Sequence, residues 1–133
     1  MTGPIPTSVT ALLGQAKSTW AGAVVEPRSA EKYRDSHIAA LRAAAAVLAL
    51  RARPAAAVRR RPTSAWVLLH QAAPELGDWT AYFADSASRR AAIEAGSLSA
   101  VTERDADDLL RAAGEFIAIV DRMVGAMQLR NAS

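Results

Sequence analysis

Arginine side chains gather in one short stretch near the middle of the chain. Arg51, Arg53, Arg59, Arg60 and Arg61 fall within eleven residues that contain no acidic residue. A planar guanidinium group can bind a phosphate through two parallel hydrogen bonds, so this arginine segment is a candidate site for a nucleotide or nucleic acid. The alternative is a solvated loop in a chain whose positive charge is nearly all arginine. The sequence leaves both interpretations open.

The chain has two histidines, and His37 is the more interesting of them. It shares one helical stripe with Tyr33 and Leu41. There it could form a small polar pocket with Tyr33 and act as a base or as a ligand contact. The alternative is a core histidine satisfied by a hydrogen bond, because buried polar groups usually have partners. We expect His37 to be mostly buried and hydrogen-bonded, and His70 to lie near the surface.

Several aromatic residues could stack on nucleic-acid bases. Each also falls at a spacing typical of the buried face of a helix, so we expect them to pack in the interior. They are Trp20, Trp66, Trp79, Tyr82 and Phe83.

The remaining candidates for chemistry are weaker. Asp105, Asp107 and Asp108 could hold Mg²⁺ through oxygen ligands, but acidic residues also favour the first turns of a helix through its dipole. Ser86 and Ser88 could be nucleophiles, but no base is positioned beside them in the sequence. There is no cysteine, which excludes thiolate zinc sites and cysteine nucleophiles. We expect no metal, no cofactor and no catalytic residue.

These residues lie on five predicted helices with no strand pattern. Ser29 and Asp78 are predicted helix caps, Thr102 and Asp105 a capping box, and Gly96 the residue that ends the fourth helix. Short loops between helices are typical of an antiparallel bundle of four or five helices. The predicted helices are 8–25, 29–53, 64–73, 78–95 and 102–129, and the second and last should be central.

The length and hydropathy fit one domain over residues 1–133, with flexible ends at 1–7 and 130–133 and a loop over 54–62. The longest apolar run, 43–50, is too short for a membrane span, which needs about 20 residues. We expect a cytoplasmic protein that does not enter the membrane. The net charge of +3 is modest, so the placement of the arginines says more than their number.

Three blocks of the chain carry a family resemblance, and together they span most of it in order. They are the stretch from Glu31 to Pro54, Ser64–Leu69 followed by Ala73–Trp79, and Glu103–Arg111. The chain resembles an actinobacterial family of small HEPN-domain proteins. The resemblance implies a four- or five-helix antiparallel bundle that is often a dimer. Many HEPN proteins are ribonucleases, and others are inactive partners of nucleotidyltransferases.

The catalytic HEPN motif is an arginine, about four to six residues, and then a histidine. His37 follows Arg34 too closely and Arg28 too distantly, and His70 follows Arg61 with eight residues between. The sequence therefore favours a non-catalytic HEPN-type bundle that binds a nucleotide, a nucleic acid or a protein partner. One alternative is a purely structural homodimeric interaction module. A third interpretation is a divergent ribonuclease that uses Arg34 and His37.

Overall fold

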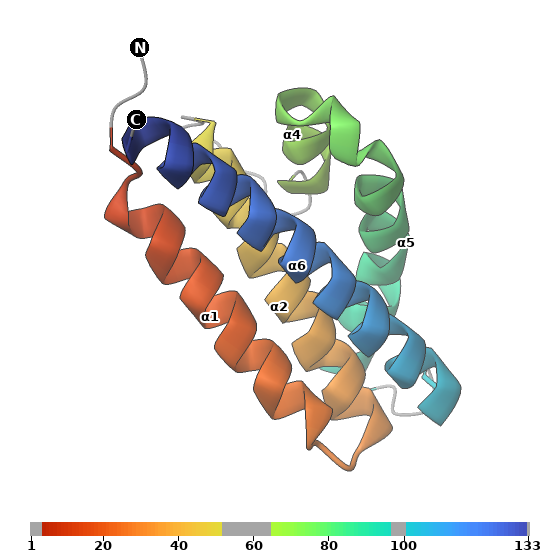
Figure 1. The fold of residues 1–133 in the computed structure, drawn as a ribbon. Coiled ribbons are helices and arrows are strands. Elements are labelled where there is room, and N and C mark those ends of the chain that lie inside the picture. The colour runs from red at the N-terminus through yellow and green to blue at the C-terminus, as the bar shows by residue number, and fades with distance from the viewer. Residues whose placement is uncertain (1–3, 52–64, 97–100, 133) are drawn as a thin grey trace.

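The computed structural model describes residues 4–51, 65–96 and 101–132. These residues form helices and contain no strand, which confirms the all-helical expectation. The helices are α1 (Thr7–Val24), α2 (Ser29–Leu50), α4 (Ala65–Ala72), α5 (Gly77–Glu94) and α6 (Glu103–Ala132), with a 3₁₀ turn, η2 (Pro74–Leu76), before α5 (Figure 1).

The long helices α1, α2, α5 and α6 alternate in direction along the chain, as an antiparallel bundle requires (Figure 1). Helix α2 is central, because it packs against α1, α4, α5 and α6. Its alanines explain how it can contact so many neighbours: Ala39, Ala40, Ala43, Ala44 and Ala46 are completely buried. Small side chains let helix axes approach closely, so α2 forms the spine of the bundle.

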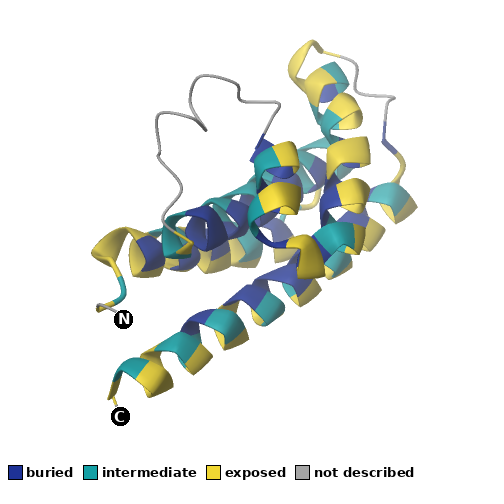
Figure 2. Cartoon of the chain, turned by 90° about the horizontal axis from the view of Figure 1, so that it is seen from above, coloured by how far each residue is buried: buried dark blue, intermediate teal, exposed yellow. Residues whose placement is uncertain are grey.

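The core is completed by aromatic rings from three helices. Phe83 of α5 stacks on Trp66 of α4 with ring centres 5.1 Å apart, and it contacts Phe116 of α6 at 5.3 Å. Figure 2 shows how this burial is arranged on α6, whose inner side is buried along the helix while its outer side is exposed. The buried residues between Leu109 and Val124 form the inner face of α6.

Two of the predicted aromatic core positions are only partly buried, and one is exposed. Trp20 and Trp79 are of intermediate exposure, and Tyr82 is 43% exposed. The prediction for Tyr82 was wrong because Phe83, its neighbour on the helix, takes the inward position and leaves Tyr82 at the edge of the buried stripe. Trp20 donates from its indole N–H to the Leu110 carbonyl oxygen at 2.8 Å, which ties α1 to α6.

The helix ends differ in part from the prediction. Helix α2 ends at Leu50, so Arg51 follows the helix instead of lying in its last turn. Helix α5 begins at Gly77, directly after η2, so Asp78 lies inside the first turn and caps nothing. Ser29 likewise is the first residue of α2, with Arg28 before it and no side-chain cap.

Other predicted ends are confirmed. Thr102 and Asp105 form the capping box: each backbone N–H donates to the other side chain, at 3.1 and 3.0 Å. Gly96 has a φ of 98° at the end of α5, a conformation that costs glycine little. Helix α6 runs past the predicted end at Leu129, to Ala132. None of the described helices combines the length and apolar character needed to cross a lipid bilayer.

Candidate functional site

His37 lies in the middle of α2, facing α5, and is 1% exposed. Its Nδ1 atom is 2.8 Å from the Ser86 hydroxyl oxygen. That hydroxyl is also 2.9 Å from the Phe83 carbonyl oxygen, to which it donates. Because serine has one hydroxyl proton, the hydrogen-bond network assigns the proton of the other contact to His37, whose Nδ1–H donates to Ser86. The Nε2 atom then carries the lone pair.

The surroundings of His37 keep the imidazole neutral. Trp66 and Phe83 meet it edge-on, with ring centres 5.9 and 6.5 Å away. Burial in this apolar setting, together with the positive charge of Arg90, lowers the pKa of His37 to about 4. The imidazole is therefore uncharged near neutral pH.

Tyr33 lies one helical turn before His37 and is also buried. Burial raises the pKa of Tyr33, while the charge of Arg89 and the nearby Ser86 hydroxyl act in the opposite direction. Both predicted residues thus face α5 near Ser86. The hollow beside His37 is lined by other residues of α2, α4 and α5, and Tyr33 is not among them.

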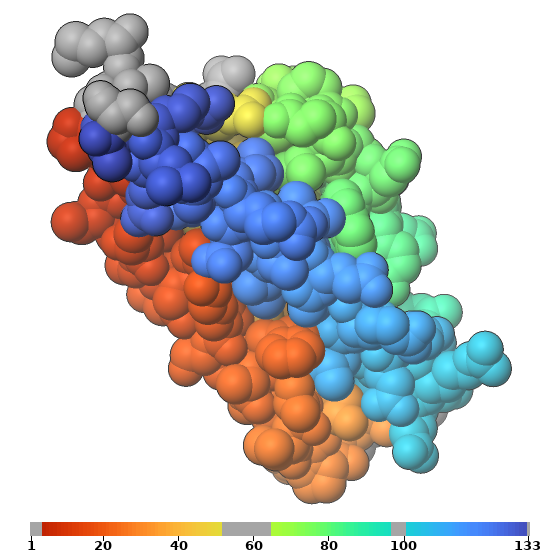
Figure 3. Space-filling view, viewed as in Figure 1, coloured from red at the N-terminus to blue at the C-terminus, as the bar shows by residue number. Residues whose placement is uncertain are grey.

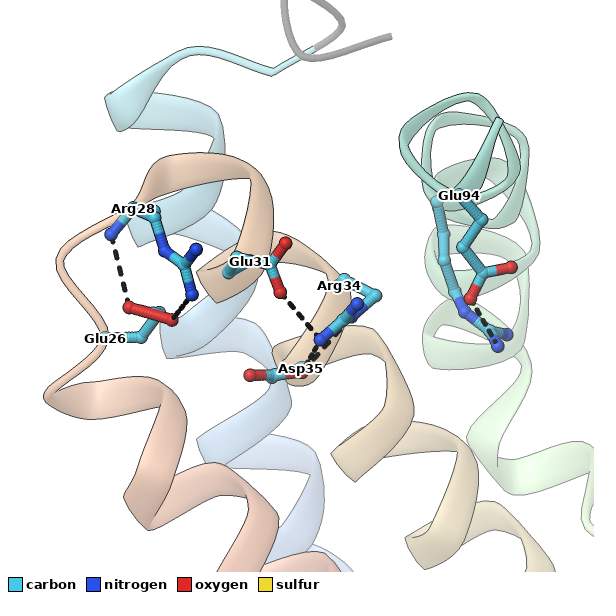
Figure 4. A network of polar contacts seen from close by, with 7 residues as sticks. Glu26, Arg28, Glu31, Arg34, Asp35 and Glu94 are labelled. Atoms are coloured by element: carbon cyan, nitrogen blue, oxygen red, sulfur yellow. Dashed lines mark hydrogen bonds and ion pairs between the residues drawn. The ribbon is translucent and has the colours of Figure 1, made fainter. Parts of the chain in front are cut away.

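That hollow is a cleft of about 290 Å³ where α2, α4 and α5 meet. His37, Leu41 and Trp66 lie on one side, and Arg90 and Glu94 of α5 on the other. The Arg90 guanidinium is paired with the Glu94 carboxylate at 3.2 Å, an ion pair visible in Figure 4. The cleft therefore combines a neutral imidazole with an ion pair whose charges already compensate each other.

Arg34, the other residue of the ribonuclease alternative, is engaged elsewhere. Its guanidinium is 2.7 Å from a Glu31 carboxylate oxygen and 3.3 Å from one of Asp35, and Figure 4 shows it between these two side chains. An arginine that stabilises a phosphodiester during cleavage must turn its guanidinium to the substrate. In this structure Arg34 serves an ion-pair network on its own helix.

Of the arginine segment, only Arg51 belongs to the described residues. Its guanidinium donates to the Ala72 carbonyl oxygen at 2.8 Å and pairs with the Glu75 carboxylate. Ala72 is the last residue of α4, so Arg51 satisfies one of the carbonyl groups that a helix end leaves without an internal partner. Arg51 thus holds the corner between α4 and α5. Arg53, Arg59, Arg60 and Arg61 lie outside the described residues.

The charges divide unevenly between the described residues and the rest of the chain. All 13 acidic residues but only 12 of the 16 basic ones are described, which gives these parts a formal charge of −1. The four arginines at 53 and 59–61 supply the difference that makes the whole chain +3. The entire surplus of positive charge therefore belongs to one stretch of the sequence, residues 52–64.

The acidic turn is occupied by structural contacts. Asp105 completes the capping box and pairs with Arg89, Asp107 pairs with Lys32, and Asp108 pairs with Arg111. Within the described ranges, no three histidine or acidic side chains converge in a way that could hold a metal ion.

The pairing of histidines with hydroxyl groups of α5 was not predicted from the sequence. Besides the His37 pair, the Nδ1 atom of the exposed His70 is 3.4 Å from the Thr80 hydroxyl, which donates to the Gly77 carbonyl oxygen at 2.8 Å. Nothing in the sequence distinguishes these two hydroxyl residues, because the exposed Ser88 also donates to a carbonyl oxygen three residues earlier. Ser86, which the sequence offers as a candidate nucleophile, therefore has a histidine beside it. The Ser86 side chain is buried, however, and its hydroxyl group donates to a backbone carbonyl oxygen.

Comparison with known protein families gives a match over most of the chain. The model of the HEPN_SAV_6107-like HEPN family matches residues 23–121, which include α2, α4, α5 and more than half of α6. No curated protein and no solved structure matches the chain. The matched range contains all three blocks that carry the resemblance in the sequence. The chain therefore belongs to the HEPN_SAV_6107-like HEPN family.

Proposed function

We propose that this protein is a non-catalytic HEPN bundle that binds nucleic acid through Arg53, Arg59, Arg60 and Arg61. The observation that carries the proposal is the charge distribution: these four arginines hold the whole positive surplus, and no acidic residue lies among them. In the described part, by contrast, most basic side chains are already paired with a carboxylate. Several guanidinium groups that are close in sequence suit a chain of phosphates.

Arg51 has a supporting part in this proposal. Because its guanidinium caps α4 and pairs with Glu75, it fixes the point at which the chain leaves α2. The arginines beyond it would make the phosphate contacts. Such contacts release counterions from the nucleic acid and depend on its backbone rather than its bases, so binding should be salt-sensitive and weakly selective for sequence.

The absence of catalysis is inferred from the state of His37 and Arg34. A general base must reach the proton that it removes, but the His37 side chain is buried, with 1% of its surface exposed. Arg34 is held by two carboxylates. Together with the missing arginine–histidine spacing, this favours binding without cleavage.

The test is a binding titration of the full chain against single-stranded RNA and duplex DNA at several salt concentrations. We expect affinity to fall as salt rises, with a slope of roughly 0.7–0.9 per phosphate contact. The RNA recovered after incubation without added metal should be intact. If the chain binds neither nucleic acid at low salt, the protein-interaction module replaces this proposal, and if the RNA is cleaved, the non-catalytic assignment is wrong.

A further inference from the structure

A second hollow, of about 520 Å³, lies between α5 and α6. Asp78, Trp79 and Tyr82 line it from α5, and Asp108, Arg111 and Glu115 from α6. Figure 3 shows the two helices beside each other on the viewed face, α5 in green and α6 in blue. The groove shares no lining residue with the cleft beside His37.

The groove is negatively charged. It has three carboxylates and one guanidinium, and Arg111 is already paired with Asp108 at 2.9 Å. Asp78 and Glu115 form no ion pair with any side chain in the described ranges. Burial raises the pKa of Tyr82, and the charge of Asp108 raises it further. The groove thus offers two uncompensated carboxylates, one on each wall.

The aromatic rings of Trp79 and Tyr82 line the same groove, and both pack against Phe83. Trp79 stacks on Phe83 at 6.2 Å, and Tyr82 meets the edge of Phe83 at 5.2 Å. Tyr82 is one of the few large hydrophobic residues that are exposed among the described residues. An aromatic face beside carboxylates attracts a cation both through the ring quadrupole and through charge.

From this arrangement we infer that the α5–α6 groove docks an arginine-bearing segment of a protein partner. Arginine fits better than lysine, because its planar group stacks on aromatic rings and pairs with carboxylates through two hydrogen bonds. The phosphates of a nucleic acid would be repelled by the same carboxylates. The inferred docking site is therefore opposite in charge to the arginine segment and would bind a different class of ligand.

The experiment measures fluorescence anisotropy of a labelled peptide with three consecutive arginines against the full chain at low salt, with a lysine peptide of equal charge in parallel. We expect the arginine peptide to bind more tightly. The double variant Asp78→Asn, Glu115→Gln should weaken its binding roughly five- to tenfold, and Tyr82→Ser should weaken it about two- to fivefold.

The matched control is Asp85→Asn with Glu103→Gln, which removes the same charge from exposed carboxylates that lie outside the groove and form no ion pair in the described ranges. It should leave peptide binding nearly unchanged. RNA binding by the groove variants should not fall, which separates this inference from the proposed function. Equal peptide affinity in the groove and control variants, or no peptide binding by the wild type, would overturn the inference.

Discussion

The hydrogen bond between His37 of α2 and Ser86 of α5 joins two helices of the bundle inside the core. It places a donor–acceptor contact of 2.8 Å between two buried side chains, one on α2 and one on α5. Such a contact adds modest stability when it is made and costs more when one partner is removed, because the other group is left buried without a bond. Both the removal of the serine and a change of pH should therefore alter the stability of the fold.

Replacing Ser86 with alanine should destabilise the protein by about 1–3 kcal/mol, because the His37 Nδ1–H is left without its acceptor. The measurement is urea-induced unfolding. Ser88→Ala is the matched control, since Ser88 makes the same local bond to a carbonyl three residues earlier but is exposed. The control should change stability by less than about 0.5 kcal/mol. Equal destabilisation of both variants would contradict a specific role for the His37 contact.

Stability should fall as the pH falls from 6.5 toward 4. In this window the unfolded chain binds a proton on His37, while the folded chain, with a pKa of about 4, does not, so unfolding is favoured. This difference in pKa corresponds to about 3 kcal/mol. The measurement compares urea unfolding of the wild type and His37→Gln across this pH range. Carboxylates with lowered pKa values, such as Glu75, contribute to both proteins. Parallel pH profiles would therefore show that His37 does not titrate as proposed.

At the scale of single residues, the sequence predicted the buried position of His37 but not its partner, Ser86. Spacing with Tyr33 and Leu41 indicated that His37 faces the interior, and it does. Its partner lies 49 residues away, on a helix whose rotation depends on how it packs. Periodicity identifies the buried side of one helix but not which residue of another helix meets it, so Ser86 could be considered only in isolation.

Among the helices, the contact of α1 with α6 is unusually close at one point. Gly114 of α6 lies under the ring of Trp20, and a Cβ atom added there would be 2.9 Å from the nearest ring carbon. The Trp20 N–H bond to the Leu110 carbonyl oxygen holds the ring in this position. The glycine therefore allows α1 to approach α6, although glycine weakens a helix interior.

Gly114→Ala should destabilise the protein by about 1–3 kcal/mol, because the added methyl group displaces the Trp20 ring. Gly125→Ala is a control on the same helix, where an added Cβ meets nothing within 4 Å. It should be neutral or stabilise the protein by up to about 1 kcal/mol through better helix propensity. Thermal or urea unfolding of both variants distinguishes them, and a stabilising Gly114→Ala would contradict the close approach.

The presence of each helix and its buried face could be predicted, because the spacing of apolar residues is a local property of the chain. The residues at which the helices begin and end were harder to predict. Asp78 looked like a cap, but the preceding 3₁₀ turn starts the helix earlier, and Arg51 falls outside a helix that was expected to include it. Tyr82 was assigned to the core because it lies at an apolar spacing, yet the neighbouring Phe83 fills that space. These outcomes depend on tertiary packing.

For the whole molecule, the main feature is a separation of charge. The described parts of the chain carry every acidic residue, including those of the groove between α5 and α6, whereas four arginines at 53 and 59–61 hold the positive surplus. Family membership accounts for the bundle. The sequence indicated the arginine segment, while the acidic and aromatic groove required the helices to be placed side by side.

The most direct measurement compares RNA affinity in two variants that each remove three positive charges. One is Arg59→Ser, Arg60→Ser, Arg61→Ser, and the other is Arg104→Ser, Arg122→Ser, Arg130→Ser, which changes exposed residues of α6. Both bring the formal charge from +3 to 0. We predict that salt-sensitive binding weakens only in the first variant, whose slope should be lower by roughly 0.7–0.9 for each phosphate contact that the substitutions remove. Equal weakening in the two variants would contradict the account, because binding would then follow net charge rather than the arginine segment.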